Sequence, residues 1–165
     1  MNTNAANDAA AVAAADRAEL ATRSWIGLRT LVLDLHDRRK EVSVALEMSF
    51  IKAKALMKVG AGPCKLRDLA TRLGTDAPYT TLIVDDLEKR GLVVRTPHPD
   101  DRRSKLVTLT DAGRAAAEVA HGIVGAPPEA VLALDTDDLI VLDRIVAALV
   151  AAEDTDRASS SVGLR

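Results

Sequence analysis

The sequence is poor in cysteine and in aromatic residues, and each of these shortages excludes a class of structure. Its 165 residues include one cysteine, Cys64, and aromatic residues make up 2% of the chain. A single thiol excludes an internal disulfide and a four-cysteine zinc site, and it fits a reducing compartment. Apolar residues still make up 48%, so the core must consist of Leu, Val, Ile and Ala. Abundant alanine favours helix, because alanine loses no side-chain entropy on folding.

Neither charge sign dominates the chain, and long apolar runs are absent. Its 22 Lys and Arg residues oppose 24 Asp and Glu residues, which gives a formal net charge of −2. A strongly basic chain would have indicated a nucleic-acid partner directly, so any such interface has to be local. The longest apolar run, Ile145 to Ala152, is far too short to cross a membrane. With no basic, signal-like N-terminus either, we expect a cytoplasmic protein without a membrane partner.

Apolar periodicity and breaker residues divide the chain into five segments. We expect a mobile arm over residues 1–15, a dimerisation helix and connection over 16–48, and a folded region over 49–118. Further dimerisation helices should occupy residues 119–152. A disordered tail should follow over residues 153–165, where serine and charged residues gather.

The middle region, residues 49–118, has a characteristic order of predicted elements. A helix over residues 65–73 ends at Gly74, and a second helix begins after Asp76, a good N-cap residue, and runs to Arg90. Two alternating segments then flank a charged loop, as the strands of a hairpin do. This order is that of a winged helix-turn-helix. The predicted fold is therefore mainly α with a small β-hairpin wing, joined to a helical dimerisation region.

Such a unit places its second helix in the major groove of DNA, and its hairpin tip reaches the neighbouring minor groove. Here these parts are helix 77–90 and wing 96–105. The helix is an unusual DNA reader, because residues 76–90 hold four acids and only two bases, both at the far end. No arginine in its first turns can bind guanine in a bidentate manner, so we expect modest discrimination by direct contacts, supported by phosphate contacts and DNA shape.

The candidates for contact with base edges are Tyr79, Thr81 and Leu82. Leu82 and the methyl group of Thr81 can touch thymine methyl groups. The alternative is that Tyr79 and Leu82 pack locally against the protein. Basic side chains around the helices and the wing are candidates for phosphate contacts: Lys65, Arg67, Arg72, Arg95 and Lys105.

Three short motifs in this region lie at a characteristic spacing. They are Leu87-Glu88-Lys89-Arg90-Gly91-Leu92-Val93, Pro99-Asp100-Asp101-Arg102-Arg103 and Leu109-Thr110-Asp111-Ala112-Gly113-Arg114. Together they resemble the MarR (multiple antibiotic resistance) family of bacterial transcriptional regulators. The resemblance implies a homodimer that binds a palindromic operator on double-stranded DNA, most often as a repressor. It also implies that a small phenolic or other aromatic effector often releases the DNA.

The resemblance also implies roles for the wing residues. Arg103 corresponds to the arginine that enters the minor groove, and Asp101 to the residue that orients this arginine through an ion pair. Arg102 would contact phosphate. The alternative for these three residues is a solvated turn whose surface ion pairs contribute little.

The last helix, which begins at Asp135, is apolar on nearly all its faces. One small domain cannot cover such a helix, so we expect it to pair with the first helix across a two-fold axis. Two recognition helices would then lie about 34–36 Å apart, one turn of DNA. Burial within one subunit is the alternative.

Effector-binding candidates lie on the first helix and near the start of the second, and they combine apolar walls with a few polar groups, as a ligand pocket requires. They are Trp25, Arg29, His36, Met48 and Phe50. The alternative is that these side chains serve core and interface packing.

Two other functions stay open. The acidic recognition helix also fits a protein-interaction module that has lost DNA binding. A thiol-based redox sensor would use Cys64, with Lys65 and Arg67 lowering its pKa, whereas the alternative is a buried inert thiol. We expect no enzyme, catalytic residue, metal site or cofactor, because the three histidines are scattered and no phosphate-binding loop is present.

Overall fold

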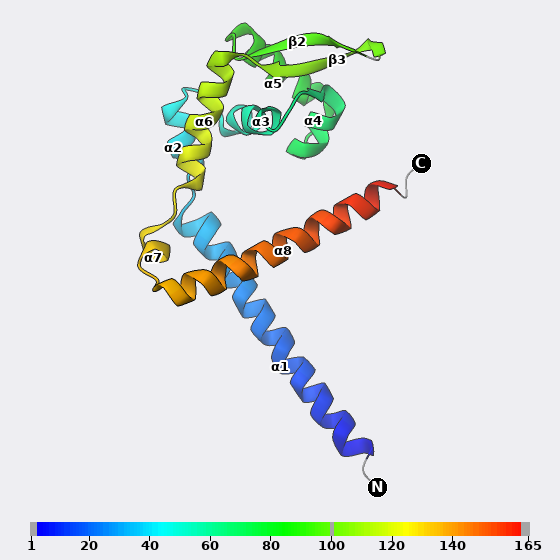
Figure 1. Cartoon of the computed structure of the whole chain (residues 1–165), viewed down its shortest axis with the longest axis vertical. Helices are drawn as coiled ribbons and strands as arrows, with labels where there is room; N and C mark the ends of the chain where they lie inside the picture. Colours follow the sequence, from blue (N-terminus) through cyan, green and yellow to red (C-terminus); the bar gives the residue numbers. More distant parts are fainter. Residues whose placement is uncertain (1–2, 100, 163–165) are drawn as a thin grey trace. The chain divides into compact units, whose positions relative to one another are not determined.

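The computed structural model describes residues 3–99 and 101–162, which form two compact units, Met1–Ala126 and Pro127–Arg165 (Figure 1). The first unit contains α1 (Thr3–Arg29), the π-helix η1 (Thr30–Leu35), α2 (Arg39–Ala45), α3 (Phe50–Gly60), β1 (Cys64–Lys65), α4 (Leu66–Leu73), α5 (Ala77–Lys89), β2 (Val93–His98), β3 (Asp101–Leu109) and α6 (Asp111–Gly125). The second contains α7 (Glu129–Leu132) and α8 (Thr136–Val162). The predicted fold class, mainly helical with a small β-hairpin, is confirmed.

The core of the first unit lies where α3, α4, α5 and the sheet meet. Leu56 of α3, Leu69 of α4, Ile83 and Leu87 of α5 and Val93 of β2 are almost completely buried there. Each helix contributes apolar residues three or four positions apart, so one face of each turns inward. Burial of each such side chain contributes roughly 1.5–3 kcal/mol, and this packing fixes α4 and α5 against the sheet.

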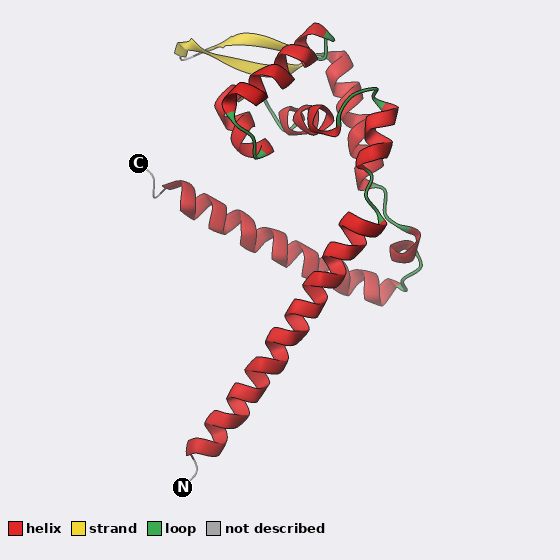
Figure 2. Ribbon diagram, turned by 180° about the vertical axis from the view of Figure 1, so that it is seen from behind, coloured by secondary structure: helices red, strands yellow, loops and turns green. Residues whose placement is uncertain are grey.

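The sheet has three antiparallel strands in the order β1-β3-β2. β2 and β3 form the predicted hairpin, which projects away from α3, α4 and α5 in both views (Figures 1 and 2). Its register pairs Val93 with Leu109 and shifts between Pro97 and His98, close to the tip. β1 was not predicted, because two residues are too short to show an alternating pattern. It pairs Cys64 with Val107 and forms the edge strand next to β3.

Three helices begin with a side-chain cap, and the sequence predicted the starts at Asp76 and Asp135. The carboxylate of Asp76 accepts a 2.7 Å hydrogen bond from the backbone N of Tyr79, and the hydroxyl of Thr110 accepts one of 3.0 Å from Gly113. The carboxylate of Asp135 accepts one of 2.8 Å from Asp138. Each cap satisfies a backbone donor that the first turn of a helix leaves unpaired, which is why these helices begin where they do.

The glycine of the Leu-Thr-x-x-Gly motif is required by a close approach of two backbone segments. A Cβ atom on Gly113 would lie 1.8 Å from the carbonyl oxygen of Leu92. The hydroxyl of Thr110 also donates a 2.7 Å hydrogen bond to the carbonyl of Gly91. The motif therefore anchors the start of α6 on the turn that leads from α5 into β2.

The N-terminal helical region differs from its prediction. One helix was expected from about Asp16 to Arg39, followed by a connection. The structure instead has α1, then η1, and then α2 over most of the predicted connection. Asp37 explains the break, because its carboxylate accepts the backbone N–H of Arg39 at 2.9 Å and so begins a new helix.

Both predicted terminal segments have a helical backbone where the structure describes them. α1 begins at Thr3, within the predicted arm, and α8 continues to Val162, within the predicted tail. Alanine, which favours helix, is frequent in both stretches. Residues 1–2 and 163–165 lie outside the described residues, and the mobility of these segments stays a prediction. Among the helices that the structure describes, none is both long enough and apolar enough to cross a membrane.

Candidate nucleic-acid interface

The turn between α4 and α5 is short and held by hydroxyl groups. Gly74 adopts a left-handed conformation with φ of 70°, which favours glycine. The hydroxyl groups of Thr75 and Thr80 lie 2.8 Å apart, and that of Thr80 donates to the carbonyl of Asp76 at 2.7 Å. Thr80 is fully buried. These bonds fix the turn against the first turn of α5.

The first turns of α5 present an apolar outer surface. Tyr79 and Leu82 are 46% and 65% exposed, so neither side chain is buried in the core. The hydroxyl of Thr81 donates a 2.9 Å hydrogen bond to the carbonyl of Ala77 within the same helix. The three side chains predicted to face base edges thus lie on one stretch of α5, with the two large ones open to contact.

Two of the acids on α5 are paired with an arginine of the wing. The guanidinium group of Arg95 on β2 lies 2.5 Å from a carboxylate oxygen of Asp85 and 2.5 Å from one of Glu88. The backbone N of Arg95 also donates to Glu88 at 3.3 Å. The side chain of Arg95 is only 19% exposed. Such charge-assisted pairs tie the recognition helix to the first strand of the wing.

A third acid, Asp86, is paired on another side of α5. Its carboxylate lies 2.8 Å from the ammonium group of Lys52 on α3 and 2.9 Å from the guanidinium group of Arg90. The hydrogen bond from Lys52 is the largest cause that holds the pKa of Asp86 below its usual value. Arg90 donates in turn to the carbonyl of Glu47, at 3.2 Å, in the loop between α2 and α3.

All four acids in residues 76–90 therefore have partners inside the protein. Asp76 caps α5, and Asp85, Asp86 and Glu88 are neutralised by Arg95, Lys52 and Arg90. We call these three acids and three bases the counter-ion cluster. It removes most of the negative charge that the sequence assigns to the recognition helix, and it leaves the apolar first turns as the distinctive outer surface.

The predicted phosphate ligands divide into engaged and accessible side chains. Arg95 belongs to the counter-ion cluster, and Arg72 donates to the carbonyl of Lys58 at 3.4 Å. Arg67 on α4 and Lys105 on β3 are exposed, and Lys65 occupies the N-cap position of α4. The backbone of Asp101 pairs with His98 in the wing, but the side chains of Asp101, Arg102 and Arg103 lie outside the described part of the structure. Their roles stay predictions.

Comparison with known proteins places this arrangement in a family. A family model described as the MarR family matches residues 60–105, from the end of α3 to the wing. The transcriptional repressor CouR, solved bound to a 23-mer DNA duplex, is 30% identical with a TM-score of 0.55, over 75% of this chain and 89% of CouR. The chain belongs to the MarR family.

Other relatives agree with this assignment. Apo MarR from Escherichia coli is 28% identical with a TM-score of 0.61, over 74% of this chain and 93% of that structure. YfiV of Bacillus subtilis, an uncharacterized HTH-type transcriptional regulator, is 40% identical over 67 residues, which are 40% of this chain and 42% of YfiV. The chain spans about half the length of the curated relatives it matches, between 41% and 56%. MarR-family proteins are transcriptional regulators and not enzymes.

Some of the predicted effector-binding residues of this MarR-family chain come together and others do not. His36 and Phe50 line one hollow of about 310 Å³, whose apolar wall also includes Val32, Leu33 and Val124. Met48 is buried and lines a separate hollow with Arg90. Trp25 and Arg29 are exposed on α1 and belong to neither lining.

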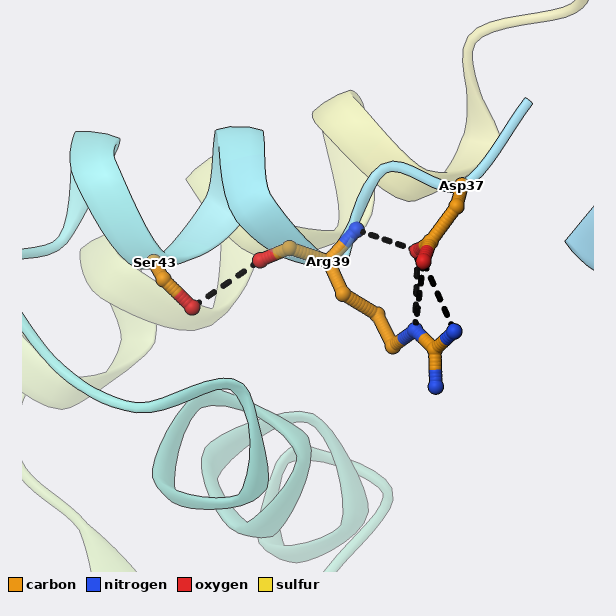
Figure 3. Close-up of polar contacts among 3 residues, drawn as sticks. All are labelled: Asp37, Arg39 and Ser43. Atoms are coloured by element: carbon orange, nitrogen blue, oxygen red, sulfur yellow. Dashed lines mark hydrogen bonds and ion pairs between the residues drawn. The ribbon is translucent and has the colours of Figure 1, made fainter. Parts of the chain in front are cut away.

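Charged residues at the rim of the first hollow are paired with one another. The carboxylate of Asp37 accepts hydrogen bonds of 2.8 and 2.7 Å from the guanidinium group of Arg39, and Ser43 donates to the carbonyl of Arg39 (Figure 3). The side-chain bond from Arg39 is the main cause that lowers the pKa of Asp37 to about 2. Arg38 is paired with Glu41 at 2.8 Å. Both arginines in the lining are therefore already neutralised.

Cys64 lies in an environment that opposes the redox interpretation. Its side chain is 3% exposed, and burial is the largest cause that raises the pKa of its thiol. A redox sensor needs a lowered pKa and an accessible sulfur. Lys65 and Arg67 do not produce the expected lowering, because β1 turns Cys64 into the core. Among the residues that the structure describes, no group of three or more His, Cys, Asp or Glu side chains is placed to hold a metal ion.

Several functional residues were missed by reasoning from the sequence. The pair Asp86 and Arg90 lies four residues apart on one helix, a spacing that sequence reasoning can detect. The contacts of Lys52 with Asp86, and of Arg95 with Asp85, join different elements and carry no local signal. Sequence analysis therefore identified the acids on the recognition helix, but it did not predict that basic side chains neutralise them.

Proposed function

We propose that this MarR-family protein is a cytoplasmic homodimer that binds double-stranded DNA at a palindromic operator and represses transcription. α5 enters the major groove, and the wing formed by β2 and β3 reaches the minor groove. The observation that carries the proposal is the counter-ion cluster, because it compensates the acids of α5 and leaves the first turns of the helix open to contact. The same observation weakens the case for a protein-interaction module, which rested on an acidic helix.

The proposed contacts combine the family resemblance of the wing with the basic residues around α4 and the sheet. Arg103 inserts into the minor groove, Asp101 orients it, and Arg102 contacts phosphate, as the family resemblance implies. Lys65, Arg67, Arg72 and Lys105 contact phosphates beside the helix-turn-helix and the wing. Arg95 is not among the proposed phosphate ligands, because its guanidinium group is paired with Asp85 and Glu88.

The proposed dimer rests on two helices with unpartnered apolar surface. Large apolar residues on several faces of α8 are exposed, among them Ile140, Ile145, Leu149 and Val150. α1 exposes Leu20, Trp25 and Ile26. Apolar surface of this extent is unusual on a monomer and marks an association site. A second copy of the chain supplies matching apolar helices for both, and it gives the two-fold symmetry that a palindromic operator requires.

The proposed effector is a small aromatic molecule that binds in the hollow lined by His36 and Phe50. Its apolar wall suits an aromatic ring, and a volume of about 310 Å³ suits a small one. Because Arg38 and Arg39 are paired with acids, the hollow favours a neutral phenol over a carboxylate. Binding here displaces α2 or α3 and so reaches α5 through Lys52 of the counter-ion cluster.

DNA binding is tested by fluorescence anisotropy with the DNA upstream of the protein's own gene, at low and at raised salt. We expect tight binding at low salt that falls steeply as salt rises, because phosphate contacts release counter-ions. Arg103→Ala should weaken binding roughly tenfold, since it removes a charged contact worth about 1.4 kcal/mol. Arg17→Ala, which removes the same charge from α1, is the control and should bind as wild type. Absence of binding at low salt, or equal affinity of the two variants, contradicts the proposal.

Dimerisation is tested by light scattering during gel filtration. We expect twice the mass of one 17.5 kDa chain. Substitution of Ile145 and Leu149 by Asp should give a folded monomer, because each buried carboxylate would cost several kcal/mol at the interface. Val94→Asp places an acid on an exposed apolar position of β2 and should leave the dimer intact. A monomeric wild-type protein, or a dimer that survives both α8 substitutions, refutes this interface.

Effector binding is tested by calorimetry with phenol and benzoate as matched neutral and anionic probes. Phenol should bind and should lower DNA affinity, whereas benzoate should bind at least several-fold more weakly, since no unpaired arginine lines the hollow. Phe50→Ala should abolish phenol binding. Stronger binding of benzoate, or phenol binding that Phe50→Ala leaves unchanged, would place the effector elsewhere.

A further inference from the structure

The first turns of α5 form an apolar surface that has a direct counterpart in DNA. Ala77, Pro78, Tyr79 and Leu82 are all exposed, although they stand at the end of a recognition helix where polar base readers are usual. Tyr79 and Leu82 lie three residues apart, so they are neighbours on one face of the helix. Exposed apolar side chains at this position are suited to contact an apolar group on the DNA.

Apart from the phenol hydroxyl of Tyr79, which both donates and accepts hydrogen bonds, polar readout from this surface is limited. The first base on α5 is Lys89, ten positions after Tyr79, which is about 15 Å further along the helix axis. The next base, Arg90, is held by Asp86 and by the carbonyl of Glu47. The hydroxyl proton of Thr81 is engaged with Ala77, and the carboxylate of Asp76 is engaged with the backbone of Tyr79.

In the major groove, the one apolar group that distinguishes a base is the C5 methyl of thymine, while guanine is read by bidentate basic side chains. We propose that α5 selects operators by contact of Leu82, supported by Tyr79, with thymine methyl groups. The half-sites of this protein therefore carry thymine where Leu82 faces the groove, and their guanine N7 atoms are not read by α5. This inference rests on the proposed function, because it assumes that α5 enters the major groove.

The test begins with a duplex that the full-length protein selects from a random pool at low salt. In one probe, a single thymine in each half-site is replaced by deoxyuridine, position by position, which removes the methyl group and leaves base pairing unchanged. At the position that Leu82 faces, affinity should fall about fourfold for each methyl group removed, the equivalent of one buried methyl. In a second probe, guanines of the half-sites are replaced by 7-deazaguanine, and affinity should stay unchanged.

Leu82→Ala links the effect to one side chain. The substitution removes an exposed leucine and introduces a good helix former, so the variant should remain folded. It should bind the thymine duplex several-fold more weakly than wild type does. On the deoxyuridine duplex, the variant and the wild type should bind alike, which is the coupling expected of a direct contact. Val44→Ala in α2, where the valine is 70% exposed, is the matched control and should keep full methyl dependence.

Two contrary results are distinguishable. If the selected duplex binds tightly but no deoxyuridine substitution changes its affinity, or if 7-deazaguanine weakens binding more than deoxyuridine does, methyl readout by Leu82 is overturned while DNA binding stands. If no duplex is retained from the pool at low salt, the proposed function fails, and this inference fails with it.

Discussion

The pairing of Arg95 with Asp85 and Glu88 is the interaction on which the rest of this account depends. A recognition helix with four acids would repel a DNA duplex, and the same helix with its acids neutralised would not. Arg95 performs this neutralisation from β2, at 2.5 Å from each carboxylate, with a side chain that is largely shielded from water. Shielding matters, because ion pairs held away from solvent are less weakened by salt than exposed ones. Of the other two acids, Asp86 is compensated by Lys52 and Arg90, and Asp76 caps the start of α5.

The counter-ion cluster also connects parts of the protein that have separate tasks. Arg95 joins α5 to the wing, Lys52 joins it to α3, and Arg90 joins its end to the loop after α2. α3 begins at Phe50, which lines the hollow proposed for the effector. A displacement of α3 by a ligand would therefore act on Asp86 through Lys52, two residues along the same helix. The cluster gives a physical route from the hollow to the DNA-binding surface, with one charged pair as its critical step.

Much of the fold was predictable, because local signals determine it. Asp76 and Asp135 begin helices as expected, and Gly74 ends α4 in the left-handed conformation. The family motifs located the wing, and Gly113 has a steric reason for its place in them. Most of what failed depended on distant contacts. The short strand β1 and the buried environment of Cys64 arise from packing between segments, whereas the break at Asp37 comes from a local hydrogen bond with the backbone of Arg39 that the apolar pattern did not indicate. Arg95 was wrongly expected to be a free phosphate ligand. Its partners Glu88 and Asp85 lie seven and ten residues away on another element, so no local pattern reveals the pairing.

The central claim is that Arg95 acts as an internal counter-ion and not as a phosphate ligand. DNA affinity, measured by anisotropy at constant salt, should be compared for wild type, Arg95→Met, and Arg95→Met combined with Asp85→Asn and Glu88→Gln, with melting temperatures to verify folding. The single substitution exposes two uncompensated carboxylates and should weaken binding roughly tenfold, as the sum of two repulsions of under 1 kcal/mol each. The account predicts that neutralising both acids restores affinity to about the wild-type value. A triple variant that folds normally but binds as weakly as Arg95→Met would contradict it.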